Sequence, residues 1–346
     1  SLRFVNFGFN YHKSKNFNRL FSMGGALDNM SQSFQLAQEM ERYGLTESEF
    51  NDILDAKNPY TKYWNQLPVL GVMGVRTGVV DWFNDPEKNI HAPWGWNGFN
   101  NNFFSKETGG ISQYDFNVSF NIEDRVYLGA TLGVYDVNYD RYTSYTENLN
   151  DDKGADNGGY TLDNYYRLEG TGMDLKLGVI VRPIESSPFR LGFAVHTPTW
   201  YDLRESYNAT LSSDILAYEK PYIQTLSDFL VTPEYDYLTY DYNLTTPWKF
   251  NVSAGTTFAG AVAVGAEYEY QDYSSSKLKD VDGYELGDQL SVENYLKGVH
   301  TFRIGMETRI IPEFSIRAGY NYSSAAFSKD AYSALSLYST RTDFNN

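Results

Sequence analysis

Hydrophobic and polar residues alternate in two neighbouring stretches near the C-terminal end of the sequence. In 302–310 every second residue is apolar or Thr, and Arg, Gly and Glu lie between them. The alternation resumes in 314–322 after a short break at 311–313. Side chains on a strand point alternately to opposite faces, so each stretch predicts a strand with one apolar and one polar face.

The same alternation recurs along the chain and predicts nine strands. We expect them at residues 4–12, 110–122, 126–142, 161–181, 189–209, 235–258, 261–275, 298–310 and 314–326. Short connections at 122–125, 183–188, 259–260 and 311–313 alternate with long polar connections at 143–160, 210–234 and 276–297. A soluble β-sandwich is the alternative, but it gives no reason for two classes of connection. Alternating short turns and long loops are typical of an outer-membrane barrel, so the predicted fold is an all-β, antiparallel transmembrane β-barrel.

One interval, 13–109, shows little strand alternation and predicts two helices. The residues of Ser31–Arg42 provide an apolar stripe, and Thr46 and Glu49 have the spacing of a capping box. In a capping box each side chain accepts a hydrogen bond from the backbone N–H of the other residue. We therefore expect 1–346 to be a single barrel domain with 13–109 inserted between strands as a partly helical lobe. The loop lengths place this lobe outside the cell.

Composition supports a membrane barrel and excludes several other classes of protein. The 28 basic and 44 acidic residues give a net charge of −16, which argues against a nucleic-acid partner. The absence of cysteine excludes disulfides and thiolate metal sites. Aromatic residues reach 17% of the chain, with 30 Tyr, as aromatic girdles at the bilayer interfaces would require. Without cysteine and without a Gly-x-Ser-x-Gly motif, nucleophilic catalysis has no signature in the sequence, so we expect no enzyme. We also expect no cofactor and no metal site, with haem and calcium as the alternatives.

Four stretches in order along the chain resemble the FadL-type family of outer-membrane transporters for long-chain fatty acids and other hydrophobic compounds. Within that family they are most similar to the branch often labelled "hemin receptor". The stretches are FVNFGFNYHKSKNFNRLFSMGG (4–25), GTGMDLKLGVIVRPIESSPFRLGFAVHTPTWYDL (170–203), TPWKFNVSAGTTFAGAVAVGAEYEYQDYS (246–274) and VHTFRIGMETRIIPEFSIRAGYNYS (299–323).

The resemblance implies a barrel of about fourteen strands that is plugged by an N-terminal hatch. Nine strands leave five outside this sequence. A closed barrel has an even strand count and both termini in the periplasm, and here the first strand starts at the periplasmic side and the last ends at the outside, so we expect an even number of strands, possibly zero, before Ser1 and an odd number after Asn346. The hatch and the C-terminal strands are expected to be absent from this chain. The resemblance also implies a multi-pass protein of the outer membrane, in contact with outer-membrane lipids. Its ligand, a fatty acid or detergent-like compound, would be captured on the extracellular lobe and released sideways through the barrel wall.

Candidate capture residues are flexible apolar side chains in the lobe, which suit varied hydrophobic tails. They are Phe21, Met23, Leu27, Met30, Phe34, Leu36 and Met40. The alternative is that they pack the small core of the lobe. A fatty-acid carboxylate would favour a cation, for which Arg19 and Lys15 are candidates, although both also fit solvated loop charges.

Charged residues on the polar strand faces are expected in the barrel lumen. They are Asp174, Lys176, Glu267, Glu269, Arg303, Glu307, Arg309 and Arg317. A selective ion pore would favour one sign of charge. The mixed signs instead predict ion pairs across strands that fill the lumen.

Three other functions stay open at this point. Haem uptake would require axial His or Tyr ligands, but His12, His91, His196 and His300 form no close pair in the sequence. The Trp- and Asn-rich segment 91–104 could dock a protein partner. Acidic loops at 150–152 and 280–283 could bind calcium, although solvated acidic loops have the same composition.

Overall fold

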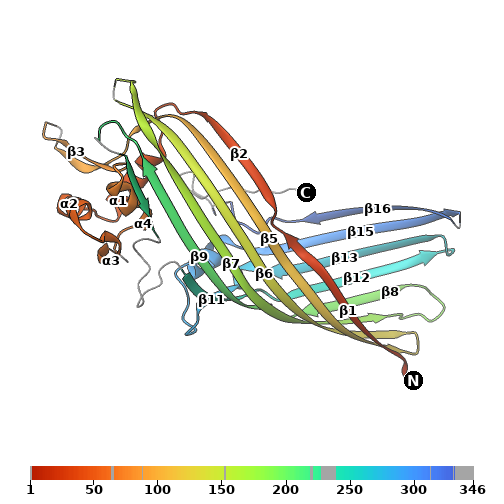
Figure 1. The fold of residues 1–346 in the computed structure, drawn as a ribbon. Coiled ribbons are helices and arrows are strands. Elements are labelled where there is room, and N and C mark those ends of the chain that lie inside the picture. Colours follow the sequence, from red (N-terminus) through yellow and green to blue (C-terminus); the bar gives the residue numbers. More distant parts are fainter. Residues whose placement is uncertain are drawn as a thin grey trace.

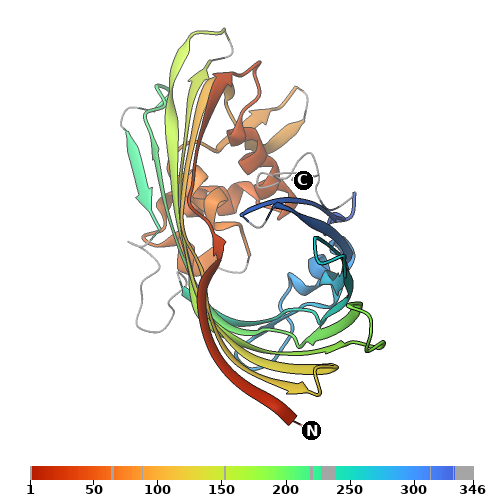
Figure 2. The same cartoon turned by 90° about the vertical axis from the view of Figure 1, so that its right-hand side faces the viewer.

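Strands of one antiparallel sheet make up most of the chain, which Figure 1 shows as a computed structural model. The structure describes residues 2–331 except 64–65, 88, 152, 219–220, 227–238, 312 and 330. Nine strands follow one another across the sheet: β1 (Leu2–Asn16), β5 (Asn97–Ile122), β6 (Val126–Asn150), β7 (Asp156–Val181), β8 (Arg190–His196), β12 (Lys249–Phe258), β13 (Val262–Asp272), β15 (Gly298–Ile311) and β16 (Phe314–Ser323). Figure 2 shows that the sheet curls, so it has a convex and a concave face. The predicted all-β, antiparallel architecture is confirmed.

Further strands extend this sheet or form a separate hairpin. The additional strands of the sheet are β2 (Arg19–Ala26), β9 (Trp200–Ser213), β10 (Tyr222–Thr225), β11 (Thr239–Thr245) and β14 (Lys277–Asp280). The hairpin consists of β3 (Asp81–Asp85) and β4 (Ile90–Trp94). The short helix α6 (Gln289–Tyr295) lies in the connection before β15.

Four short connections, at 123–125, 182–189, 259–261 and 312–313, join strands at one end of the sheet, which we call the turn end. Glu123 and Asp124 have φ values of 55° and 56°, and Ala259 and Gly260 have 49° and 65°. Two consecutive residues with positive φ are the requirement of a two-residue type I′ hairpin turn, whose twist matches that of the strands. The short turns predicted from the sequence are therefore confirmed.

The opposite end of the sheet, the lobe end, differs from the prediction. β5, β6 and β7 have 26, 25 and 26 residues, so they continue through most of the predicted loop 143–160. The predicted loop 210–234 begins with the end of β9, and its residues 227–234 lie outside the described part. The loop predictions failed because polar residues occupy both faces here, and the period-two signal is lost although the backbone pairing continues.

Four helices lie against the concave side of the sheet at the lobe end (Figures 1 and 2). They are α1 (Gln32–Arg42), α2 (Glu47–Asp55), α3 (Pro59–Tyr63) and α4 (Val69–Arg76). The two predicted helices correspond to α1 and α2. The Glu49 N–H donates to Thr46 Oγ1 at 3.3 Å and the Thr46 N–H donates to Glu49 Oε2 at 2.9 Å, so the predicted capping box is present. The interval 13–109 also contains more strand than its pattern predicts, because β2 pairs with the first part of β5.

The main hydrophobic core lies between these helices and the concave side of the long strands. Met40 of α1 and Met73 of α4 are fully buried there, together with Leu149 of β6, Leu162 of β7 and Leu211 of β9. The described helices of the lobe and the long strands therefore share one hydrophobic core. The helices pack on the concave face at the lobe end, where the long strands continue beyond the part of the sheet whose convex side chains are apolar.

Two predicted strands, 189–209 and 235–258, are each interrupted once, and the interruptions are neighbours. The first falls at 197–199, between β8 and β9, and the second at 246–248, between β11 and β12. Each contains a proline, which has no N–H to donate to a sheet. Threonine hydroxyls replace two carbonyl acceptors there: the Thr199 N–H donates to Thr246 Oγ1 at 2.8 Å, and the Leu175 N–H donates to Thr197 Oγ1 at 3.0 Å. The Thr197 and Thr246 N–H groups still donate to the Leu175 and Thr199 carbonyls at 2.9 and 3.0 Å. We call this feature the paired break.

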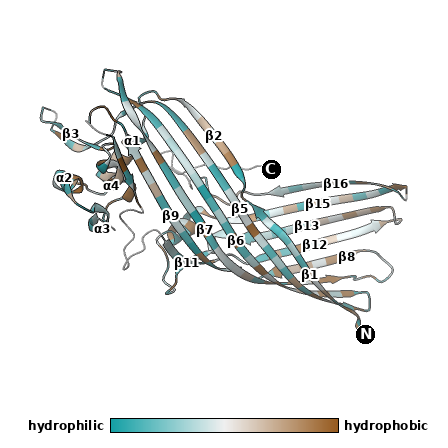
Figure 3. Cartoon of the chain, in the orientation of Figure 1, coloured by the Kyte–Doolittle hydropathy of each residue, from teal (hydrophilic) through white to brown (hydrophobic). Residues whose placement is uncertain are grey.

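The convex face changes from apolar to polar at one level across neighbouring strands. Tyr114, Val134, Met173 and Trp200 form one row of directly opposed residues. Convex residues toward the turn end are apolar, as in Phe116, Leu132 and Leu175, and the next row toward the lobe is Ser112, Asp136, Thr171 and Asp202. Hydrophobic and hydrophilic residues are accordingly interspersed along the strands in Figure 3. The apolar part of β5 has the length of about 9–11 residues that a tilted strand needs to cross a bilayer. None of the described helices is both long and apolar enough to span a membrane.

Candidate functional site

Tyrosine side chains cover the concave face between the lobe and the level of the apolar band. They come from β6, β7, β9 and β11, and we call them the tyrosine wall: Tyr135, Tyr139, Tyr166, Tyr201, Tyr207 and Tyr242. They share a face with Leu162 and Leu211, which pack against the lobe, because residues two apart on a strand point the same way. The ring centroids of Tyr135 and Tyr201 are 5.8 Å apart and those of Tyr139 and Tyr166 are 6.1 Å apart.

Polar partners fix the hydroxyl groups of the wall. Tyr166 donates to Glu205 Oε2 at 2.9 Å, and Tyr207 donates to Asn164 Oδ1 at 2.7 Å. Burial and the nearby Glu205 carboxylate raise the pKa of Tyr166, so its hydroxyl stays neutral at physiological pH. The wall therefore presents neutral aromatic rings in set orientations. Such a surface suits an apolar or aromatic ligand better than a free ion.

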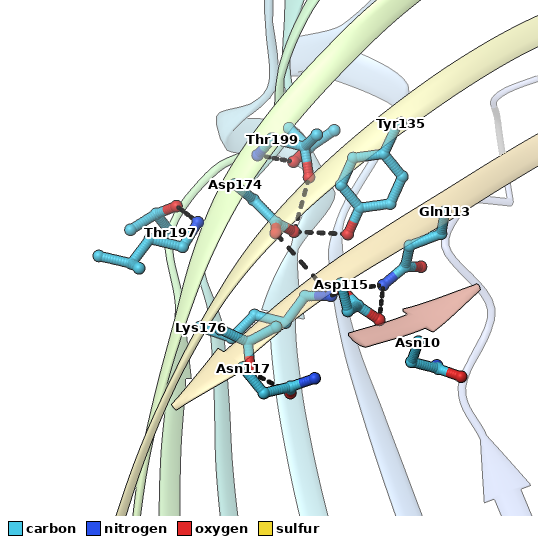
Figure 4. Close-up of polar contacts among 12 residues, drawn as sticks. Asn10, Gln113, Asp115, Asn117, Tyr135, Asp174, Lys176, Thr197 and Thr199 are labelled. Carbon is cyan, nitrogen blue, oxygen red and sulfur yellow. Dashed lines mark hydrogen bonds and ion pairs between the residues drawn. The ribbon is translucent and has the colours of Figure 1, made fainter. Parts of the chain in front are cut away.

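A buried polar network lies directly below the wall, toward the turn end (Figure 4). Asp174 of β7 is 5% exposed, and its Oδ2 accepts from the Tyr135 hydroxyl at 2.7 Å and from Thr199 Oγ1 at 3.3 Å. Because Thr199 belongs to the paired break, this carboxylate fastens the break to β7. The network thus joins the tyrosine wall to the interrupted part of the sheet.

Lys176 connects this carboxylate to β5. Its Nζ lies 2.9 Å from Asp115 Oδ1 and 3.8 Å from Asp174 Oδ1. Asp115 also accepts from Gln113 Nε2 at 2.8 Å. One lysine between two buried carboxylates compensates charges that would be costly to bury alone. The group holds three strands in register.

Charged residues continue across the concave face on the remaining strands. Lys249 of β12 lies 3.7 Å from Glu269, and Arg303 of β15 pairs with both Glu267 and Glu269 of β13. Arg317 Nε of β16 donates to Glu307 Oε2 at 2.8 Å. All of these except Lys249 were predicted lumen charges, and the structure places them on the concave face and pairs them across strands. Arg309 is exposed near the turn end of β15.

A row of glycines leaves part of the concave face without side chains. Gly255, Gly265, Gly305 and Gly319 lie directly opposite one another on β12, β13, β15 and β16. A Cβ atom added at Gly305 would meet nothing within 4 Å. A shallow groove of about 530 Å³ follows this glycine row. The row gives the concave face a smooth strip beside the Arg317–Glu307 pair.

The predicted capture residues fall into three groups. Phe21 and Met23 lie on the concave face of β2 and are 40% and 57% exposed, and Met30, before α1, is 69% exposed. Leu27 and Phe34 are half-buried, and the Phe34 ring meets Trp94 edge-on at 5.3 Å. Leu36 and Met40 are buried in the core between lobe and sheet. The structure does not bring all seven into one surface.

One of the two candidate cations for a carboxylate, Arg19, lies beside the exposed group. Arg19 and Lys15 are both exposed, on β2 and β1. The Arg19 guanidinium lies 5.8 Å from the centre of the Phe21 ring and 3.9 Å from Glu107 Oε1. Arg19 is therefore next to apolar side chains, although a carboxylate already neighbours it.

Residues considered for haem, calcium or a protein partner have other contacts. His300 Nδ1 is 2.8 Å from the Tyr268 hydroxyl, and Asp151 Oδ1 accepts from the backbone of its own turn. No three His, Asp or Glu side chains within the described ranges are grouped as a metal ion would require. In the segment 91–104, Trp96 Nε1 donates to the Gly78 carbonyl at 2.7 Å, so this ring is part of the lobe packing.

Comparisons with known proteins give structural matches alone. No family model and no curated protein sequence matches the chain. A solved structure of a Pseudomonas aeruginosa FadL homologue matches with a TM-score of 0.44 and 14% identity, over 95% of this chain and 73% of the other. The CymD monoaromatic hydrocarbon channel matches with a TM-score of 0.39 and 14% identity over 72% of each chain. The Ralstonia pickettii toluene transporter TbuX matches with a TM-score of 0.37 and 16% identity, over 69% of this chain and 70% of the other.

The Pseudomonas aeruginosa match is described as a FadL homologue. The FadL-type family is the one that the four sequence stretches resemble.

Sequence reasoning missed the tyrosine wall. It assigned the many tyrosines to girdles at the membrane interface, and this fits Tyr11 and Tyr114, which are neighbours on the convex face at the edge of the apolar band. The wall tyrosines face the other way. Their spacing in the sequence could have revealed them. Tyr135 and Tyr139 lie an even number of positions before the buried Leu149 on β6, so all three side chains point to the same face.

Proposed function

We propose that the protein is an outer-membrane transporter that takes up long-chain fatty acids or other hydrophobic small molecules. The observation that carries the proposal is the change of the convex side chains from apolar to polar at one level, while the concave face between the lobe core and the turn end is mainly polar and aromatic. A sheet with these two surfaces fits a barrel with lipid outside and a ligand path inside. The turn end then faces the periplasm and the lobe faces the outside.

The surfaces along the concave face suggest the order of events. A ligand first meets the exposed side chains of Phe21 and Met23, then the tyrosine wall, then the charged network around Asp174. Each surface is more polar than the one before, so an apolar ligand would bind above the network and would not pass straight through it. This favours an exit before the turn end.

Sideways release into the membrane belongs to the same proposal. The paired break lies beside the Asp174 network, at the lower edge of the tyrosine wall. The regular strand pairing is interrupted there, and threonine hydroxyls take the place of backbone carbonyls as acceptors for two N–H groups. A ligand released at this level would not have to pass the charged residues that lie between the Asp174 network and the turn end.

A variant of the glycine row tests whether ligands instead pass to the turn end. Gly305→Leu fills the concave groove, and because no atom lies within 4 Å of the added Cβ we expect normal folding. Ala318→Leu is the matched control, since Ala318 is exposed on the convex face of the adjacent strand. Uptake of a radiolabelled fatty acid into cells that depend on this protein is the measurement.

The two outcomes have different meanings for the proposal. If release is sideways above the charged network, both variants retain uptake, and loss of uptake in Gly305→Leu alone would place the route along the groove. The transport function itself is tested by deleting the gene. If uptake of hydrophobic compounds is then unchanged, the protein is not their transporter.

A further inference from the structure

The convex face carries an aromatic and charged patch well above the apolar band. Two adjacent rows of directly opposed residues form it, on β5, β6, β7 and β9. The row nearer the lobe is Lys106, Tyr142, Tyr165 and Asn208, and the row below it is Thr108, Asp140, Arg167 and Ser206. These eight side chains line a groove of about 510 Å³.

An aromatic ridge runs along the upper side of this groove. The ring centroids of Phe104 and Tyr142 are 6.1 Å apart, and those of Tyr142 and Tyr165 are 4.9 Å apart. The Tyr142 hydroxyl donates to Asp163 Oδ1 at 2.8 Å, which fixes the orientation of the central ring. The Tyr165 ring is about half exposed. Water therefore reaches a set of rings that none of the described lobe residues covers.

Charged and hydrogen-bonding groups lie directly below the ridge. Arg167 Nε donates to Asp140 Oδ1 at 2.7 Å, and both side chains remain partly exposed. Lys106 is exposed at the other end of the upper row. The groove thus combines a flat apolar surface with two cations, one carboxylate and several neutral donors and acceptors.

The distance of the patch from the apolar band restricts the kind of ligand that it can bind. Tyr165 lies eight residues along β7 from Met173, which marks the edge of the apolar band. At ~3.3 Å per residue and a strand tilt of ~35–45°, this is roughly 20 Å beyond that edge. An acyl chain stays in the apolar layer and does not reach this height. The head group of a large glycolipid does.

We propose that this groove binds the oligosaccharide of an outer-leaflet glycolipid. One face of a sugar ring exposes C–H groups that pack on an aromatic ring, and its hydroxyls suit Asp140, Ser206 and Asn208. Arg167 and Lys106 suit the phosphate or carboxylate groups that such head groups contain. The inference rests on the membrane orientation in the proposed function but is independent of transport.

Calorimetric titration with a lipid-free oligosaccharide tests the proposal. The probe is the phosphorylated core oligosaccharide released from lipopolysaccharide by complete deacylation, added to the purified full-length protein in detergent micelles. We expect saturable binding that weakens about tenfold or more in the double variant Tyr142→Ala/Tyr165→Ala, because two ring contacts are lost. Tyr43→Ala is the matched control, since it removes an exposed tyrosine from the lobe, and its affinity should equal that of the wild type.

A second variant covers the case in which the double variant does not fold. Arg167→Gln leaves the ridge intact and should weaken binding of the phosphorylated probe more than binding of the same probe after phosphatase treatment. Absence of binding by the wild type, or equal affinity in all variants, overturns the proposal. Binding of the intact glycolipid but not of the lipid-free oligosaccharide also overturns it, because recognition would then lie on the apolar band. If the wild type is a dimer and the double substitution makes it a monomer, the patch is an interface between copies and the proposal is overturned as well. Each of these results leaves the uptake assay unaffected, so failure here is distinct from failure of the transport function.

Discussion

Glu147 is the side chain on which attachment of the lobe to the sheet depends most directly. It lies on β6, is fully buried, and its Oε2 accepts from the Tyr160 hydroxyl at 2.6 Å and the Tyr145 hydroxyl at 2.8 Å. The same atom accepts from the backbone N–H of Gln32 at 3.2 Å, at the first turn of α1. A carboxylate at this position is favoured by the helix dipole, so one buried charge joins α1 to two strands.

The structure gives a magnitude for removing this carboxylate. Glu147→Leu keeps an apolar side chain of similar length but leaves the hydroxyls of Tyr145 and Tyr160 without their acceptor. Each buried hydroxyl that loses its partner costs about 1–3 kcal/mol, so we expect the lobe to lose about 2–6 kcal/mol of stability. In a Tyr145→Phe/Tyr160→Phe background no hydroxyl remains to be left unpaired. The same Glu147→Leu change should then cost less, because only the Gln32 N–H still loses its acceptor, and replacing the hydroxyl partners by apolar groups is close to neutral.

Amide hydrogen exchange in α1 measures this prediction, because a loosened lobe opens locally while the sheet stays folded. Protection of the α1 amides should fall in Glu147→Leu and largely return when the two phenylalanines are added. Exchange in β15, far from the lobe, is the internal control. If Glu147→Leu lowers protection equally in both backgrounds, the hydroxyl bonds do not stabilise the lobe and the reasoning fails.

Two further predictions concern the two faces of the sheet and the surface of the lobe. A spin label at Ile304, on the convex face, should show collisions with a lipid-soluble relaxing agent, whereas one at Arg303 should show collisions with a water-soluble agent; equal water exposure would contradict the membrane orientation. Hydrogen bonds from Lys62 and Tyr63 hold the pKa of Asp52 below its ordinary value, so this carboxylate stabilises the lobe above about pH 4 and the contribution is lost as the pH falls through the lowered pKa. Proteolysis of the lobe should therefore increase on acidification in the wild type and change less in Asp52→Asn.

The parts of the fold that the sequence predicts are those where two environments differ sharply. Along β15 and β16 one face is apolar and the other charged, and the predicted strands 298–310 and 314–326 agree with the structure to within a few residues. The capping box at Thr46 and Glu49 is also local, since both partners lie within one helical turn. Signals of this kind need no knowledge of the rest of the chain.

Features that depend on distant residues were not predictable in the same way. Beyond the apolar band, β6 reads Tyr135, Asp136, Val137, Asn138 and Tyr139, and no rule of alternation says which face is concave. The concave face is the one that the lobe covers, and the strand residues that contact the lobe lie far from it in the sequence. The network of Asp115 and Lys176 joins residues 61 positions apart, so it depends on strand register that composition does not specify.

The capture surface can now be tested with residues that are accessible. Met40 is fully buried, so replacing it would loosen the lobe and confuse capture with stability. Phe21 and Met23 are exposed on β2 next to Arg19, which makes Phe21→Ser/Met23→Ser the sharper variant. Burial of a lipid tail stabilises a complex by about 0.8 kcal/mol per methylene, so contacts along this strand should contribute more to a long tail than to a short one. The double variant should weaken binding of stearate more than binding of octanoate, measured by fluorescence displacement, whereas Arg19→Gln should weaken both acids equally because both carry the same carboxylate. If the double variant also weakens both acids equally, β2 is not the surface that receives the tail.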